Sequence, residues 1–184
     1  MIAVIDYGAG NLRSVINAVS SLGFEPVVTS DAADIRRADK VILPGVGAAG
    51  STVDSLKACG LAGAVAGYIA SGRPFLGICI GMQVLFSHTE EGGGSDCLGI
   101  IPGCVRKLPP GLKVPHMGWN QVRQLNTHPV FEGIQDEADF YFVHSYYADT
   151  STDTVVAGTT HYGVDFVSAA ARDNIFAVQF HPEK

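Results

Sequence analysis

Short apolar runs and helically spaced apolar positions alternate along the first half of the chain. Apolar runs occur at residues 2–5, 40–43 and 74–79, and residues 25–29 (EPVVT) have the β-branched character of a further strand. Continuously apolar strands with helices between them are typical of a parallel sheet that is covered on both faces.

The segments between these strands predict helices. Apolar residues recur at helical spacing over residues 12–22, and Asp31 is placed to cap a short helix over 31–38. An Ala- and Gly-rich helical region is expected over roughly 48–72, and a short helix over about 80–87.

The second half of the chain changes character, because short strand-like segments replace the alternation of strand and helix. We therefore expect hairpins that extend the same sheet in antiparallel fashion, rather than further βαβ units. The expected fold is α/β and flavodoxin-like, with a mostly parallel central sheet, helices on both faces and an antiparallel extension, in a single domain over residues 1–184. The expected strands of this half lie at 113–122, 139–147, 154–160, 166–171 and 175–180.

The composition narrows the classes of function. Apolar residues make up 47% of the chain and charged residues 16%, and the formal charge of −6 argues against a sequence-independent nucleic-acid binder. No uncharged run reaches the roughly 20 residues of a membrane-spanning helix, and no signal peptide is expected. Four cysteines without a CxxC pair predict free thiols in a reducing cytoplasm.

The segment GICIG at residues 77–81 is the first candidate for chemistry. A nucleophile between two glycines, where a strand becomes a helix, forms a nucleophile elbow. The helix N-terminus would favour the thiolate form of Cys79, and the backbone N–H of Ile80 would face an oxyanion on the attacked group. Taken alone, Cys79 could equally be a buried core cysteine. The cysteines outside this context are expected to be structural: Cys59, Cys97 and Cys104.

A base and its orienting group are expected at the end of the chain. His181 and Glu183 are two residues apart in an extended segment, so their side chains project to the same side. Glu183 can then accept the proton of one ring nitrogen of His181 and leave the other nitrogen facing Cys79. The other histidines have no HxH or HExxH spacing, so no metal site is expected.

The glycine-rich segment PGVG at residues 44–47 supports two interpretations. Its backbone N–H groups could supply a second oxyanion donor beside Cys79. Alternatively, GVGAAG at 45–50 matches a dinucleotide fingerprint, and GAGNLR at 8–13 nearly does, with Asp31 at about the right distance to hold a ribose. The dinucleotide interpretation leaves GICIG and the terminal HPE segment unexplained, so we favour the oxyanion loop.

With GICIG and HPE at 181–183, the chain resembles the class I (triad) glutamine amidotransferases. The resemblance spans essentially the whole chain, and within the class it is closer to the glutaminase subunits of histidine biosynthesis than to relatives in other pathways. The segments that discriminate are DYGAGNLRSV at 6–15, LPGVGA at 43–48, PHMGWN at 115–120 and FVHSYY at 142–147.

The resemblance implies a role for each matching residue. Cys79 is implied to be the nucleophile, His181 the acid and base, and Glu183 the group that orients His181. Gly45, Val46 and Ile80 match the oxyanion region. The positions that match residues around bound glutamine are Gly47, Gln83, Glu91, His144, Ser145 and Tyr146. From spacing alone, Gln83 also lies one helical turn after Cys79, whereas Glu91 could be an ordinary exposed acid beside Glu90.

The resemblance also implies a partner and no cofactor. In this family the glutaminase docks on a (β/α)₈-barrel cyclase that consumes the ammonia. The positions that match the interface are Asn11, Trp119, Asn120 and Lys184. Without the resemblance, Asn11 would be a helix N-cap and Trp119 a core or hairpin aromatic. Family members usually continue after the HPE segment with a short final helix, whereas this sequence ends at Lys184.

The favoured function is therefore glutamine hydrolysis through a Cys79 thioester, with the ammonia passed to the cyclase. Two alternatives keep the nucleophile elbow: the glutaminase subunit of another biosynthetic amidotransferase, or a peptidase- or chaperone-like protein of the same fold. A third is a nucleotide-binding module that uses Gly8, Gly10 and Asp31. Reaction with glutamine separates the glutaminases from the chaperone-like alternative, and dispensability of Cys79 would favour the third.

Overall fold

Five parallel strands form one half of a 13-stranded sheet in the computed structural model, which describes residues 1–184. They are β1 (Ile2–Ile5), β2 (Pro26–Thr29), β3 (Lys40–Leu43), β4 (Phe75–Ile78) and β13 (Ile175–Val178). Their order across the sheet is β2-β1-β3-β4-β13, so the last strand in the sequence lies beside β4 in the middle of the sheet. Because β13 is parallel to β4, the carboxyl ends of the two strands meet at one edge.

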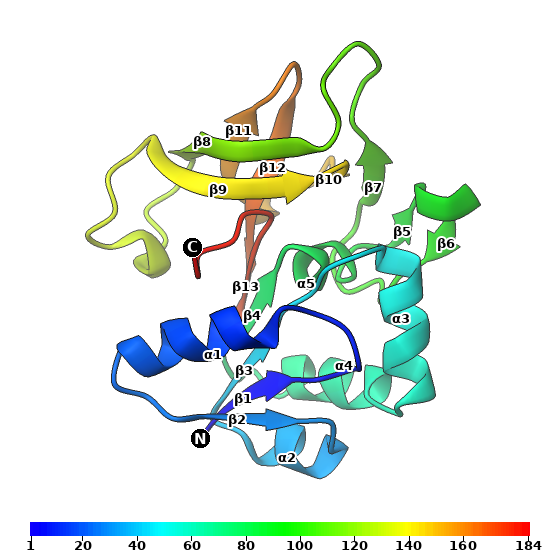
Figure 1. Cartoon of the computed structure of the whole chain (residues 1–184), viewed down its shortest axis with the longest axis vertical. Coiled ribbons are helices and arrows are strands. Elements are labelled where there is room, and N and C mark those ends of the chain that lie inside the picture. Colours follow the sequence, from blue (N-terminus) through cyan, green and yellow to red (C-terminus); the bar gives the residue numbers. More distant parts are fainter.

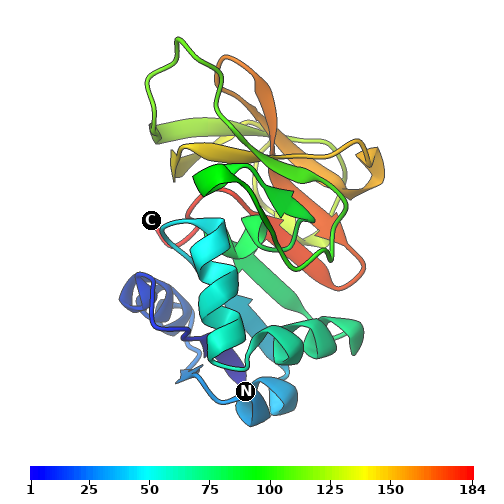
Figure 2. The ribbon, with the colours of Figure 1, turned by 90° about the vertical axis from the view of Figure 1, so that its right-hand side faces the viewer.

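Helices cover both faces of these parallel strands, as the sequence predicts. They are α1 (Leu12–Ser21), α2 (Ala32–Arg37), α3 (Ala49–Ala58), α4 (Ala62–Ala70) and the short α5 (Ile80–Gln83). Figure 2 shows α1 on one side of the strands and α4 on the other, and α4 packs against α2 and α3. This arrangement is the one that right-handed crossovers impose on the strand order β2-β1-β3-β4.

The helical region expected over 48–72 is two helices rather than one. Gly60 interrupts it with a left-handed backbone (φ +69°), and the N–H groups of Gly60 and Leu61 bond to the carbonyls of Lys57 and Leu56. This pair of hydrogen bonds is a Schellman motif, which ends α3 and lets the chain turn into α4.

The helix expected over 80–87 is also shorter than predicted. The carbonyl groups of Val84, Leu85 and Phe86 accept N–H groups from residues 98–101 at 2.8–2.9 Å, instead of continuing the helical ladder. The contact with a distant segment therefore ends α5 after one turn, which local propensity alone does not reveal.

Strands that pair almost entirely in antiparallel fashion form the other half of the sheet, in agreement with the sequence, and only the short pairing of β5 with β7 is parallel. They are β5 (His88–Thr89), β6 (Ser95–Asp96), β7 (Cys104–Lys107), β8 (His116–Gln124), β9 (Ala138–His144), β10 (Tyr146–Asp149), β11 (Val156–His161) and β12 (Asp165–Arg172). Figure 1 shows β8 and β9 as a ribbon that crosses above the parallel strands, with the C-terminal end of the chain beneath it. One hydrophobic cluster of 43 buried residues extends through both halves.

None of the helices has both the length and the apolar character needed to cross a membrane.

Candidate active site

Three neighbouring parallel strands deliver the candidate residues to one edge of the sheet. Strand β3 runs into Pro44–Gly47, β4 into Cys79, and β13 into the segment that contains His181. Ligands of open α/β sheets bind at the carboxyl ends of the strands. The topology therefore brings together segments that lie far apart in the sequence.

Cys79 is held in a strained backbone conformation between β4 and α5. Its φ is +55° and its ψ is −109°, and it is one of three non-glycine residues with positive φ. The flanking glycines make the turn possible. A Cβ atom on Gly77 would lie 2.6 Å from the carbonyl oxygen of Gly81, and one on Gly81 would overlap the carbonyl oxygen of Leu43. Strain of this kind at a nucleophile is the signature of an elbow.

His181 and Glu183 form a buried pair beside Cys79. The Nδ1 of His181 lies 2.9 Å from Oε1 of Glu183, and both side chains are less than a tenth exposed. Burial lowers the pKa of His181, but contacts with Cys79 and Glu183 outweigh burial and raise the pKa to about 9. Burial also opposes ionisation of Glu183, yet its hydrogen bond with His181 lowers its pKa overall. His181 therefore carries its second proton at neutral pH.

The other ring nitrogen of His181 is free to act. Its Nε2 is buried and faces Cys79, the contact that helps to raise the pKa of the ring, but the geometry there is not that of a formed hydrogen bond. The main chain fixes the ring from behind, since the N–H of His181 donates to the carbonyl of Tyr141 at 2.9 Å. A fixed imidazole with one nitrogen held by a carboxylate and the other open is suited to general acid and base work.

A cavity of about 130 Å³ opens in front of Cys79 and His181. The structure brings together here every position that the resemblance assigns to glutamine. The lining residues are Val46, Gly47, Cys79, Ile80, Gln83, Glu91, Val143, His144, Ser145, Tyr146 and His181.

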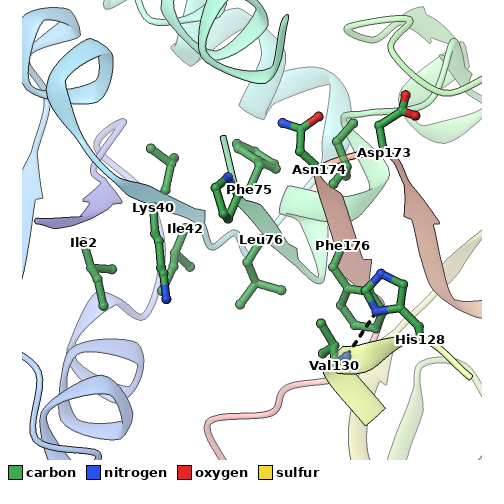
Figure 3. A pocket seen from close by; sticks show the side chains of 13 residues that line it. Ile2, Lys40, Ile42, Phe75, Leu76, His128, Val130, Asp173, Asn174 and Phe176 are labelled. Atoms are coloured by element: carbon green, nitrogen blue, oxygen red, sulfur yellow. Dashed lines mark hydrogen bonds between the residues drawn. The ribbon is translucent and has the colours of Figure 1, made fainter. Parts of the chain in front are cut away.

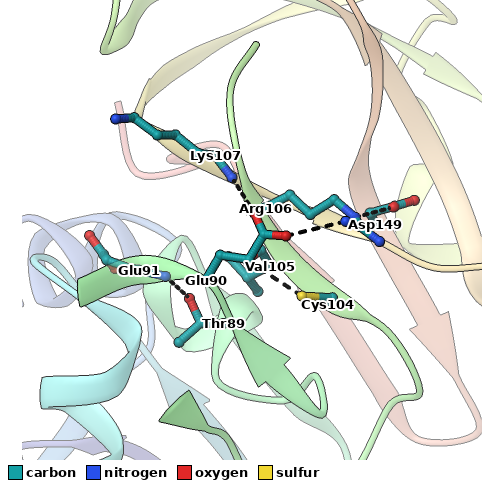
Figure 4. Close-up of polar contacts among 8 residues, drawn as sticks. All are labelled: Thr89, Glu90, Glu91, Cys104, Val105, Arg106, Lys107 and Asp149. Carbon is teal, nitrogen blue, oxygen red and sulfur yellow. Dashed lines mark hydrogen bonds and ion pairs between the residues drawn. The ribbon is translucent and has the colours of Figure 1, made fainter. Parts of the chain in front are cut away.

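Glu91 is not an ordinary surface acid. Figure 4 shows that the carboxylates of Glu90 and Glu91 point away from each other. Glu90 pairs with Arg106 at 3.2 Å, and Arg106 also pairs with Asp149 at 2.6 Å. Glu91 instead lines the cavity, where its Oε2 accepts the N–H of Ala49, at the start of α3, at 3.0 Å. The ion pairs of Glu90 thus fix this turn, and Glu91 places a negative charge at the cavity.

A chain of polar contacts leads from Asn120 to the wall of the cavity. Because the carbonyl of Tyr146 can only accept, Nδ1 of His144 donates to it at 2.9 Å. Nε2 of His144 then accepts from Nδ1 of His116 at 2.9 Å, and Nε2 of His116 accepts from the amide of Asn120 at 3.2 Å. Burial lowers the pKa of both histidines to about 4, so both are neutral at pH 7.

The oxyanion loop packs closely against the elbow. A Cβ atom on Gly45 would lie 2.8 Å from Cβ of Ile80 and 2.8 Å from the hydroxyl of Tyr7. Gly47 has φ +94° and open space around it, and Val46 between them is exposed. Ile80 is the first residue of α5, so its N–H has no helical acceptor. Both expected oxyanion segments therefore border Cys79.

Three of the four expected interface residues lie at or beside a second hollow, of about 210 Å³, behind the oxyanion loop. The amide of the fourth, Asn120, is instead bound to His116 and to the carbonyl of His161. Asn11 and Lys184 line it together with Val46, His181 and Glu183. Trp119, on β8, is 62% exposed and packs edge-on against Tyr141, another residue of this hollow. The side chain of Asn11 occupies the N-cap position of α1 but does not cap it, and donates to Ser14 at 2.9 Å.

The residues of the dinucleotide interpretation have local roles. The carboxylate of Asp31 accepts the N–H of Ala33 at 2.7 Å and so caps α2. Gly50 lies inside α3 rather than in a phosphate-binding turn. Neither residue borders the cavity at Cys79.

The remaining cysteines are free, but they are not all core residues. Cys59 is exposed at the end of α3, which contradicts the expectation that it is structural. It follows the last helical residue, where a side chain points to solvent. Cys97 and Cys104 are half-buried, and burial raises the pKa of Cys97 to about 11. Neither has the strained turn that marks Cys79.

A larger hollow, of about 330 Å³, lies at the amino ends of the central strands. Its walls are mostly apolar, from residues such as Ile42, Leu76 and Phe176. Figure 3 shows that its polar residues do not converge. The amide of Asn174 is bound to the carbonyls of Ile69 and Arg73, and His128 accepts the N–H of Val130. The hollow thus lacks the paired titratable groups that the cavity at Cys79 has.

Gln179 is a site residue that the sequence reasoning missed. Its side chain is fully buried, and its Nε2 lies 3.6 Å from Sγ of Cys79. The i, i+2 spacing that links His181 with Glu183 extends backward to Gln179, so the same rule contained the signal.

Comparison with known proteins places the chain in a family. The family model described as "Glutamine amidotransferase class-I" matches residues 3–184. The chain therefore belongs to the class I glutamine amidotransferases. Among its relatives is the imidazole glycerol phosphate synthase subunit HisH of Dehalococcoides mccartyi strain CBDB1, which is 55% identical over 100% of this chain and 90% of its own length. The same-named subunit of Methanothermobacter thermautotrophicus is 53% identical, with 100% and 91% covered.

Solved structures agree with the expected fold. PurLQS from Thermotoga maritima superposes with a TM-score of 0.77 at 19% identity, over 99% of this chain and 87% of that chain. A structure described as a glutamine amidotransferase gives a TM-score of 0.76 at 18% identity, over 100% and 91%. At such identities the match shows the fold alone, and the α/β expectation is confirmed.

Proposed function

We propose that the chain hydrolyses L-glutamine to glutamate and ammonia, as the glutaminase subunit of imidazole glycerol phosphate synthase in histidine biosynthesis. The observation that carries this proposal is the strained Cys79 beside the buried His181–Glu183 pair. Relatives with that printed function, 50–55% identical across the whole chain, support the assignment to this pathway. Residues 1–184 act in it as one glutamine amidotransferase domain in the cytoplasm.

The reaction proceeds in two halves. The Cys79 thiolate attacks the side-chain amide carbon of glutamine, and N–H groups of Ile80 and of the Gly45–Val46 peptide hold the oxyanion. His181 gives its proton to the departing nitrogen, so ammonia leaves and a glutamyl thioester remains. His181 then takes a proton from water as the water attacks the thioester, and glutamate leaves with the thiolate restored.

The cavity residues bind the rest of glutamine. The carboxylate of Glu91 pairs with the α-ammonium group, because it is the acidic side chain of the cavity. Gln83 and Gly47 flank the substrate on the elbow side. The segment His144, Ser145 and Tyr146 forms the opposite wall, and neutral His144 shapes this wall without competing with His181 for protons.

The ammonia passes to a (β/α)₈-barrel cyclase that forms a heterodimer with this chain and makes imidazole glycerol phosphate and AICAR. The surface of Asn11, Trp119, Asn120 and Lys184 is the proposed docking face. An exposed tryptophan next to a hollow that reaches His181 supports this choice, because tryptophans dominate binding energy at interfaces. No cofactor, nucleic acid or membrane takes part.

Glutamate release from glutamine tests the proposal. The purified chain is assayed alone and with a cognate cyclase and its nucleotide ligand, and Cys79→Ala serves as the blank. We expect release that is stimulated by the liganded cyclase and lost in the variant. Hydrolysis at the parent rate by Cys79→Ala, or no hydrolysis in any mixture, would overturn the proposal.

A further inference from the structure

Gln179 is a fully buried amide next to the nucleophile that the reaction described above does not use. It follows β13 directly, and its backbone N–H is bound to the carbonyl of Ser168 on β12 at 2.9 Å. The side chain is therefore fixed at its base by the sheet, and its amide lies between two residues of the cavity, Cys79 and Gln83.

The side-chain amides of Gln179 and Gln83 are linked in a row of hydrogen bonds in which each donor and acceptor is fixed. Oε1 of Gln179 accepts from Nε2 of Gln83 at 2.8 Å, and the same Nε2 donates to the carbonyl of Tyr146 at 2.9 Å. Both N–H bonds of Gln83 are thus used. Its Oε1 is buried and has no partner in the chain, although the residue lines the cavity.

The sulfur of Cys79 determines which side of the Gln179 amide faces it, and so which atom donates in each hydrogen bond of this row. Nε2 of Gln179 lies 3.6 Å from Sγ, within the range of a hydrogen bond to sulfur. A thiolate accepts but cannot donate, so the N–H side of the Gln179 amide faces it and the oxygen faces Gln83. If the Gln179 amide flipped, its oxygen would meet the thiolate and its N–H groups would meet those of Gln83.

We propose that Gln179 is a positioning residue that couples the nucleophile to substrate recognition. Its N–H stabilises the Cys79 thiolate, and its oxygen holds the Gln83 amide with Oε1 free to accept an N–H of the substrate. The inference rests on the proposed glutaminase function. Gln179 thus has two separable effects: it stabilises the thiolate form of Cys79, and it increases the affinity for the substrate through Gln83.

Two substitutions separate these effects. Gln179→Glu keeps an oxygen that accepts from Gln83, but it offers no N–H to sulfur and its charge opposes a thiolate. Gln179→Met has a similar length and provides neither contact. Ser168→Ala is the matched control, because Ser168 is a fully buried polar residue on the neighbouring strand, with an unpartnered hydroxyl and no place in the cavity.

The first readout is alkylation of Cys79 by iodoacetamide against pH, followed on the Cys79 peptide by mass spectrometry because three other thiols are free. Both variants of Gln179 lose the hydrogen bond to the thiolate. We therefore expect the midpoint of the alkylation profile to move upward by about one pH unit in each of them. The second readout is glutamine hydrolysis. We expect the KM to rise about tenfold in Gln179→Met and to stay within about twofold of the parent value in Gln179→Glu and Ser168→Ala.

An unchanged alkylation midpoint together with an unchanged KM in folded Gln179→Met would overturn the inference. If Gln179→Met does not fold, as shown by its thermal melt, the near-isosteric Gln179→Glu decides, and its midpoint must rise. A parent protein that is alkylated at Cys79 but never hydrolyses glutamine would overturn the proposed function instead. The two failures are therefore distinguishable.

Discussion

Gly81 packs against the carbonyl oxygen of Leu43 with no room for a methyl group between them. This contact presses the first turn of α5 onto the end of β3, and so sets the elbow of Cys79 beside the oxyanion loop. The two segments that must act together in the proposed reaction are thus held against each other by backbone packing at Gly81, in addition to the contact of Gly45 with Ile80.

Gly81→Ala is accordingly expected to destabilise the fold. Overpacking of a rigid backbone contact costs about 1–3 kcal/mol or more, so the urea midpoint should fall clearly. Gly67→Ala is the matched control, because Gly67 lies in α4 with nothing within 4 Å of an added Cβ. It should stabilise the protein by about 0.5–1 kcal/mol. Equal midpoints for the two variants would contradict the packing argument.

The neutral pair His116 and His144 predicts how stability depends on pH. Burial holds both pKa values at about 4, whereas histidine in an unfolded chain titrates near 6.5. Between these values the unfolded state binds more protons, so the free energy of unfolding should fall as the pH is lowered from 6.5 toward 4. His181, with its pKa raised to about 9, acts in a separate window, and its contribution is lost as the pH rises from 6.5 through 9.

Urea unfolding at several pH values checks this prediction. Between pH 4 and 6.5, the free energy of unfolding of the parent should rise with pH, and the slope gives the number of protons taken up on unfolding. His116→Gln should reduce this number by up to one. An identical slope in parent and variant would show that His116 is not held neutral in the folded state.

Glu91→Gln should weaken glutamine binding more than it slows turnover. Loss of a charge-assisted contact with the α-ammonium group raises the KM by about tenfold or more. Glu90→Gln is the neighbouring control, since that carboxylate faces Arg106. The KM values of the two variants are measured by steady-state kinetics. A KM that changes in both variants, or in neither, would contradict the assignment of Glu91.

Trp119→Ala should separate partner binding from hydrolysis. The side chain is 62% exposed, so we expect the thermal melt and the basal glutaminase rate to match the parent. Truncation of an interface tryptophan is expected to weaken cyclase binding by about tenfold or more, which titration of the stimulated rate measures. Leu22→Ala, exposed at the far end of α1, is the control that should leave this titration unchanged.

Much of the fold follows from local sequence patterns, and the deviations have non-local causes. The apolar runs locate β1, β3 and β4 to within a residue, because buried parallel strands need continuous apolar character. The early end of α5 was not predictable, because it depends on carbonyl groups that bond to residues 98–101. The pattern of residues 80–87 alone cannot show that another segment will bind these carbonyl groups.

The site was predictable where a motif carries its own geometry. GICIG implies a strained turn, and the i, i+2 rule implies the His181–Glu183 contact, which the structure has at 2.9 Å. The polar chain through His116, His144 and Tyr146 depends on the pairing of β8 with β9, so sequence spacing could not reveal it. Gln179 was within reach of the same rule, but a lone glutamine at the end of an apolar run does not suggest chemistry.

The proposed reaction depends on a covalent glutamyl intermediate on Cys79. Its most direct test is to quench the parent chain with acid during turnover of glutamine, with the liganded cyclase present, and to map adducts by mass spectrometry. We expect a glutamyl adduct on the Cys79 peptide of the parent chain. Cys79→Ser should show neither the adduct nor glutamate release. Glutamate release that persists at the parent rate in Cys79→Ser, or an adduct on another residue, would contradict it.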